Sequence, residues 1–312
     1  MRAVSEEFLH DLKDGMLRHL TERVRVDDTL MLALRGASIN IYYRGGNLMR
    51  IAKKNPGSYR ATFDVNYAGK NAFPEQLALL EQLPKSIGTE ADCQLWLKSF
   101  PHLKEIMNSY LAKHPKLERE FQQLVAWENN RSRNANGTEY FITDIEYDGG
   151  AGSGRFDMVG LRWLAKDKKT GKKCGPVFIE MKYGDSALDG KAGLQKHLAD
   201  LSATLRDELR SEKLNNMIES QFRQLDQLGL LRFNRAKVFD GVTVSGRPEV
   251  IIIIANTNPN STILRRLIGS VDEPVDFELR FFVARFAGYG LHSKCVVGLR
   301  AFQALLDSGD LQ

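Results

Sequence analysis

Two charged residues stand in an otherwise apolar stretch between residues 176 and 183. Glu180 and Lys182 are separated by Met181 and follow the apolar run Val177–Ile179. Successive side chains of a strand point to opposite faces, so Glu180 and Lys182 would share one face. Burying an acid and a base there costs free energy unless both are paired or bind an ion. The pattern indicates a strand whose two charged side chains are paired or bind an ion.

Asp157 has the same setting one strand earlier. It lies in the apolar stretch Phe156–Leu161, which a lysine-rich turn joins to the strand of Glu180. Strands joined in this way pair as an antiparallel hairpin, which would bring Asp157 and Glu180 close together. Two carboxylates in a half-buried place repel each other unless a cation lies between them. Hard oxygen ligands favour Mg²⁺ or Mn²⁺, which would keep several waters.

Such a centre is suited to phosphodiester hydrolysis. The ion would polarise a phosphoryl oxygen and lower the pKa of a bound water, while Lys182 would hold that water or stabilise developing negative charge. A purely structural interpretation stays open beside this one. In it, Glu180 and Lys182 form a buried ion pair and Asp157 caps a loop.

A third acid is placed by helical periodicity in the segment before the first of these strands. Leu117, Phe121, Leu124 and Val125 form its apolar stripe, and Glu128 falls about 20° from Leu117 at 100° per residue. An inward-facing Glu128 would be a metal ligand or would contact one. An acid that reaches solvent from a fraying helix end fits the pattern equally well.

The elements that position these residues form an α/β pattern over residues 116–312. Apolar periodicity predicts helices over 116–130, 188–228 (broken near Ser211), 261–268 and 299–306, and strands over 140–147, 155–163, 176–183, 249–256 and 277–286. A central mixed sheet flanked by helices would result.

Residues 1–115 predict a smaller α+β domain of unknown role. We expect a helix over 5–22, strands over 30–34, 39–43, 47–52 and 59–66, and helices from Pro74 onward, one of them begun by Thr89 with Asp92. Gly45-Gly46 predicts a two-residue hairpin between the second and third strands.

This order of elements resembles the core of the PD-(D/E)XK nuclease superfamily, a restriction-endonuclease-like fold. The likeness covers residues 116–260 and rests on Asp157 in one strand and Glu180-Met181-Lys182 in the next. Phe156 stands where the family name has Pro. The resemblance implies that Asp157 and Glu180 bind the metal, with the Met181 carbonyl as an additional ligand, and that Lys182 is the catalytic lysine.

The resemblance also implies further features. Many superfamily members place a Gln or Lys in the following helix, here Gln195, although an ordinary solvated glutamine fits as well; His197 nearby is typical of a helix surface. DNA is the expected substrate, in restriction, repair or phage defence, and assembly with further copies or a partner protein stays open. The alternative is a catalytically silent nucleic-acid-binding or assembly protein that keeps the fold.

Two groups of basic residues could contact phosphates, although solvated surfaces would look the same. The first is the turn Lys166, Lys168, Lys169, Lys172 and Lys173. The second, in the amino-terminal strands, is Arg44, Arg50, Lys53, Lys54 and Arg60, interspersed with Tyr42, Tyr43 and Tyr59.

Bulk composition permits these functions and excludes others. A net charge of +5 allows a nucleic-acid partner. The three cysteines, Cys93, Cys174 and Cys295, form no CxxC pair, which argues against a zinc knuckle or a disulfide framework. The amino terminus has no signal-peptide pattern, and the longest apolar run, Val250–Ala255, is too short to cross a bilayer. We therefore expect a cytoplasmic protein without a membrane partner.

Overall fold

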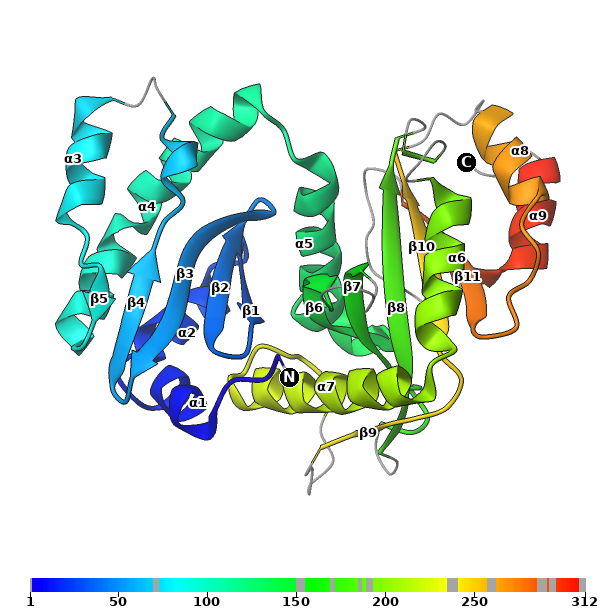
Figure 1. Cartoon of the computed structure of the whole chain (residues 1–312), viewed down its shortest axis with the longest axis horizontal. Helices are drawn as coiled ribbons and strands as arrows, with labels where there is room; N and C mark the ends of the chain where they lie inside the picture. The colour runs from blue at the N-terminus through cyan, green and yellow to red at the C-terminus, as the bar shows by residue number, and fades with distance from the viewer. Residues whose placement is uncertain are drawn as a thin grey trace. The chain divides into compact units, whose positions relative to one another are not determined.

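The computed structural model describes residues 2–69, 73–149, 155–168, 172–184, 187–188, 193–234, 241–256, 262–284, 291 and 296–308. It shows a mixed α/β protein with two sheets, which agrees with the predicted α/β class (Figure 1). The chain divides into two compact units. We call residues 1–123 with 224–230 the amino-terminal unit, and residues 124–223 with 231–312 the carboxy-terminal unit.

The amino-terminal unit is built on a five-stranded antiparallel sheet of order β1-β2-β3-β4-β5. Its elements are α1 (Glu6–Lys13), α2 (Arg18–Val26), β1 (Leu30–Leu34), β2 (Ser38–Tyr43), β3 (Gly46–Asn55), β4 (Ser58–Thr62), α3 (Pro74–Gln82), β5 (Ser86–Ile87) and α4 (Glu90–Lys113), with the first half of α5 (Leu117–Asn130). The predicted antiparallel meander is confirmed. Thr89 and Asp92 form the predicted capping box of α4.

The turn between β2 and β3 lies one residue earlier than predicted. Arg44 and Gly45 both have positive φ, 50° and 69°, while Gly46 already pairs with Tyr43. Gly46 is needed for space instead, because a Cβ there would lie 2.6 Å from Met107 Cε and 2.7 Å from the Tyr67 hydroxyl. The glycine pair therefore serves a turn and a close approach.

The segment 224–230 belongs to the amino-terminal unit through its own hydrogen bonds. The Gln224 side chain accepts from the Val4 N–H at 2.9 Å and donates to the Val4 carbonyl at 2.8 Å. Arg25 Nε donates to the Leu228 carbonyl at 2.7 Å. A strand-like pairing of this kind satisfies backbone groups that burial would otherwise leave unpaired.

The carboxy-terminal unit is built on a mixed sheet of order β12-β11-β10-β8-β7-β6, with β9 paired to β8. Its elements are the second half of α5, β6 (Tyr140–Asp148), β7 (Arg155–Arg162), β8 (Lys173–Tyr183), α6 (Leu194–Leu205), α7 (Glu208–Gln227, which ends in the amino-terminal unit), β9 (Thr243–Val244), β10 (Glu249–Ala255), α8 (Thr262–Gly269), β11 (Glu278–Ala284), β12 (Val297–Gly298) and α9 (Leu299–Ser308). The predicted hairpin of β7 and β8 is antiparallel, and β10 runs parallel to β8.

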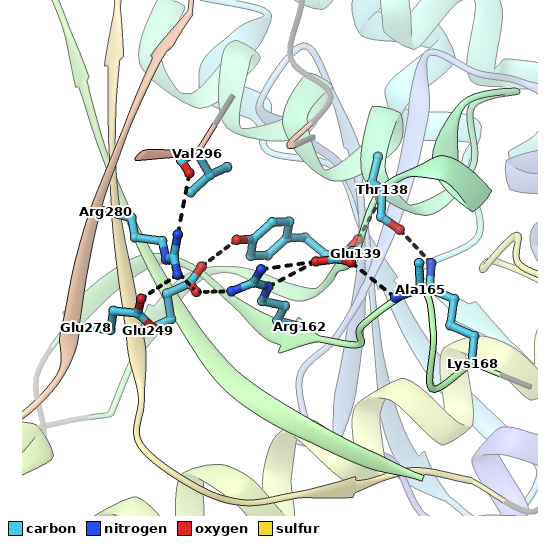
Figure 2. A network of polar contacts seen from close by, with 10 residues as sticks. Thr138, Glu139, Arg162, Ala165, Lys168, Glu249, Glu278, Arg280 and Val296 are labelled. Carbon is cyan, nitrogen blue, oxygen red and sulfur yellow. Dashed lines mark hydrogen bonds and ion pairs between the residues drawn. The ribbon is translucent and has the colours of Figure 1, made fainter. Parts of the chain in front are cut away.

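A buried polar network ties four strands of this sheet together (Figure 2). Glu249 at the start of β10 is 5% exposed and accepts from the Tyr140 hydroxyl at 2.6 Å and from Arg162 Nη1 at 2.9 Å. Arg280 Nε lies 2.9 Å from the same carboxylate. These residues come from β6, β7, β10 and β11, so the network fixes the strands against one another.

The network and the predicted site lie on opposite faces of the sheet. The β8–β10 ladder pairs Glu249 with Val177 and Ile252 with Glu180. Positions 177 and 180 differ by an odd number of residues, so their side chains point to opposite faces. The network therefore holds the strands together on the face opposite Glu180 and is not part of the site itself.

The described residues include two free cysteines and no helix that could cross a membrane. Cys93 and Cys174 are buried free thiols, while Cys295 lies outside the described residues. No helix in the described part of the chain combines the length and apolar composition needed to span a membrane.

Candidate metal centre

Asp157 lies where β7 separates from β8. The ladder between the two strands ends at Met158 opposite Ile179, so Asp157 and Glu180 are the next residues on their strands. The Met181 N–H donates to Asp157 Oδ2 at 2.7 Å. The half-buried Asp157 carboxylate thus accepts from the Met181 N–H where β7 no longer offers a backbone carbonyl, and this bond holds the carboxylate against β8.

Glu180 is buried, with its side chain 6% exposed, and the side chains of Lys182 and His197 both contact its Oε1. Lys182 Nζ donates to this oxygen at 2.9 Å, and His197 Nδ1 lies 2.9 Å from it. In the tautomer with Nδ1–H, His197 also donates to the carboxylate.

The Glu180 carboxyl is ionised because of these contacts. Burial raises the pKa of Glu180, but the hydrogen bonds and positive charge supplied by His197 and Lys182 outweigh it, so the net pKa is lowered. The surroundings are apolar: in the β8–β10 ladder Ile252 lies opposite Glu180 and Ile254 opposite Lys182, and both isoleucines are fully buried. In such a place an unbalanced charge is costly.

The chemistry of the donor set fits a hard divalent cation. Asp157 and Glu180 supply carboxylate oxygens, and a carboxylate with one hydrogen-bonded oxygen keeps acceptor capacity. The Met181 carbonyl points to the same strand edge as its N–H, which faces Asp157. Among the described residues no group of three or more Asp, Glu, His or Cys side chains gathers for metal binding. Mg²⁺ is commonly held by one or two carboxylates with waters and substrate phosphates.

Glu128, the acid expected to face inward from α5, contacts a residue outside the group described so far. Its half-exposed side chain accepts a hydrogen bond from Asn134 Nδ2 at 3.3 Å. The predicted stripe is wrong, because Leu117 and Leu124 are 39% and 41% exposed. The buried face of α5 is instead largely polar and includes Gln122, Gln123, Val125, Ala126, Asn129 and Asn130. A search for apolar periodicity could not find such a face.

Gln195, the expected helix residue of the site, contacts Ser270. It is exposed, and its Nε2 donates to Ser270 Oγ at 2.9 Å. His197, which sequence analysis treated as a surface residue, contacts Glu180 instead. The signal was present in the spacing, since Leu194, His197, Leu198 and Leu201 follow the i, i+3, i+4, i+7 pattern of one helix face. Figure 1 shows α6 beside β8.

The lysine-rich turn does not act as a uniform phosphate-binding loop. Lys168 is 6% exposed, and its Nζ donates to the carbonyls of Thr138 (2.5 Å) and Asn136 (3.3 Å), as Figure 2 shows for Thr138. Burial lowers the pKa of Lys168. Its ammonium group is a structural donor to the segment before β6. Lys169 lies outside the described residues.

The site thus joins Asp157, Glu180, the Met181 backbone, Lys182 and His197 on adjacent elements. In comparisons with known proteins, no family model, curated protein or solved structure matches the chain.

Proposed function

We propose that the protein is a divalent-metal-dependent nuclease that hydrolyses phosphodiester bonds in DNA, with a core of the PD-(D/E)XK type. The observation that carries the proposal is the contact of the buried Glu180 carboxylate with Lys182 and His197, next to the point where the Asp157 carboxylate accepts from the Met181 N–H. Asp157 and Glu180 would hold Mg²⁺ or Mn²⁺, together with the Met181 carbonyl.

The residues of the chain divide the work of the reaction. When bound, the metal would polarise the scissile phosphate and lower the pKa of a water. Lys182 would donate hydrogen bonds to negative charge that develops on the phosphate oxygens. His197 would keep Glu180 oriented after Lys182 turns toward the substrate. The net positive charge of the chain favours the approach of a polyanion.

A second function is favoured by the same contacts. The pairing of Lys182 with Glu180, and of Asp157 with the Met181 N–H, satisfies these groups within the protein. A catalytically silent nucleic-acid-binding or assembly protein would need nothing more from them. The two proposals differ in whether the carboxylates bind a metal that supports cleavage.

The test compares variants of the site with matched control variants on the surface of α6. Purified protein is incubated with plasmid and linear DNA in Mg²⁺ or Mn²⁺, with and without a chelator. Asp157→Asn keeps an acceptor for the Met181 N–H, and Lys182→Gln keeps a donor. The controls are Asp200→Asn and Lys196→Gln, which alter an exposed ion pair of α6.

We expect chelator-sensitive cleavage that falls by about 10²-fold or more in each site variant and stays unchanged in the controls. Calorimetric Mn²⁺ titration should show weaker binding in Asp157→Asn. Cleavage of equal strength in wild type and Asp157→Asn would identify a contaminant. Absence of both cleavage and Mn²⁺ binding in the wild type would favour the silent alternative.

A further inference from the structure

The outer face of β3 and β4 carries cations that the proposed reaction does not use. In the ladder between these strands, Ile51 pairs with Ala61, and both are buried. The neighbouring pairs point the other way: Arg50 lies opposite Thr62 and Ala52 opposite Arg60. Arg50, Arg60 and Thr62 are exposed, so this face of the two strands is open.

Three cations on this face are available to a partner. Arg50, Arg60 and Lys54 are exposed, and none of the three side chains has a hydrogen bond or ion pair among the described residues. Two further cations, Arg44 in the turn before β3 and Lys53 in β3, are engaged elsewhere. Arg44 pairs with Glu120 at 2.8 Å, and Lys53 pairs with Glu7 of α1. We call Arg50, Lys54 and Arg60 the basic face.

The spacing and charge of the basic face suit a linear polyanion. Arg50 and Arg60 are diagonal neighbours across the ladder, about 7–8 Å apart. Lys54 follows Arg50 by four residues along β3 and is the unpaired residue of the ladder's irregularity between Lys53 and Asn55, at most about 13 Å from Arg50. The outward residues between them, Ala52 and Ser58, are small, and no acidic residue occurs in β3 or β4. Glu7 of α1, an acid that contacts these strands, is engaged with Lys53 and the Gly57 N–H. Arginine and lysine side chains held on a sheet can contact phosphates.

We propose that the basic face binds the phosphate backbone of DNA and so adds a contact surface, in the amino-terminal unit, to the proposed cleavage centre. The choice of DNA among polyanions rests on the proposed function. The contact is independent of sequence, because arginine and lysine side chains that reach only phosphates carry no base information. Its strength depends on salt through the release of counterions.

The test measures binding without cleavage. An Asp157→Asn parent protein is titrated, in a chelator, with a fluorescein-labelled DNA duplex, and anisotropy is followed over a range of salt concentrations. The variant is Arg50→Gln/Lys54→Gln/Arg60→Gln. Its matched control, Arg23→Gln/Lys98→Gln/Lys113→Gln, removes the same charge from exposed positions of α2 and α4. Circular dichroism verifies that both triple variants fold.

We expect the basic-face variant to bind at least about tenfold more weakly at about 50 mM salt, and the slope of log K against log salt to become less steep by about 2.7. The control should keep the parent slope. Equal losses in both variants, an unchanged slope in the basic-face variant, or no binding by the parent would overturn the proposal.

Two further outcomes separate this proposal from its premises. A loss seen with an RNA of the same sequence but not with DNA would overturn the assignment to DNA. If the wild type cleaves nothing while the basic-face variant loses DNA affinity, the binding surface stands and the nuclease proposal falls.

Discussion

Glu180 stays charged in a buried position because two groups reach the same oxygen. Lys182 approaches along its own strand, and His197 approaches from α6. If a buried carboxylate has only one charged partner, loss of that partner leaves its negative charge uncompensated. In the proposed reaction, His197 would continue to compensate the carboxylate if Lys182 turned toward a phosphate.

The role of His197 can be separated from simple packing by two substitutions. Asn places an amide nitrogen where histidine has Nδ1, whereas Ala removes the donor. We expect His197→Ala to lower the free energy of unfolding by about 1–2 kcal/mol and to raise the Mg²⁺ concentration needed for half-maximal cleavage. His197→Asn should lose less than half as much in both. Urea unfolding and metal titration of activity measure the two effects; equal losses in both variants would show that the Glu180 contact is unimportant.

At the level of single residues, sequence analysis could locate charges in strands but not the direction of helix side chains. Asp157, Glu180 and Lys182 stand out because a charge in an apolar strand is conspicuous. The apolar stripe expected for α5 is wrong because this helix buries glutamines and asparagines, such as Asn130, whose side chain bonds both backbone groups of Ile142. Polar burial of this kind depends on partners that are distant in sequence.

The elements were predictable where alternation or helical periodicity extends over several turns or strand pairs. β1 and the strand cores around Glu180 and Ile252 follow from apolar runs. The helix expected over 5–22 is two helices, because the chain turns at Asp14–Leu17 before α2 begins. Pro101 lies inside α4. The two-residue strands β5, β9 and β12 are too short for any period to show.

The contact between α2 and α4 depends on pH through His19. Its ring bonds Glu22 on its own helix and Glu90 in the first turn of α4, and Arg18 lies 2.9 Å from the same Glu90 carboxylate. The hydrogen bonds to Glu22 and Glu90 raise the pKa of His19 above its ordinary value of 6.5. The lowered pKa of Glu90 keeps that carboxyl ionised in mildly acidic solution.

A group with a raised folded-state pKa stabilises the fold below its unfolded pKa and loses this contribution as pH rises through the folded value. We expect wild type to be more stable than His19→Gln below about pH 6.5, and the difference to shrink as pH rises above the ordinary histidine pKa and through the raised pKa of His19. Urea unfolding at a series of pH values measures the difference. A gap that widens with rising pH would contradict the assignment.

At the scale of the whole molecule, neither unit is a continuous stretch of sequence. The amino-terminal unit comprises residues 1–123 and 224–230, and the chain changes units within α5 and within α7. The predicted boundary between residues 115 and 116 falls in the short connection between α4 and α5. Hydrophobic periodicity marks where helices lie, but a helix that serves two units carries no sign of the change in its sequence.

A fragment of residues 1–123 should therefore be less stable than one completed by the distant segment. We expect attachment of 224–230 through a flexible linker to raise the fragment's resistance to urea, because Gln224 and the Leu228 carbonyl restore bonds to Val4 and Arg25. The control carries Gln224→Ala in the same segment and should gain less. Identical unfolding of all three fragments would refute the expectation.

The same arrangement bears on how the chain is made. A ribosome releases the first 123 residues well before residues 224–230 emerge, roughly 5–20 s later at about 5–20 residues per second. During that interval the backbone of Val4 and the side chain of Arg25 await their partners, and much of the carboxy-terminal sheet emerges first. Completion of the nascent amino-terminal unit thus follows synthesis of the strands that carry Asp157 and Glu180. A translation product that ends before residue 224 would lack part of both units.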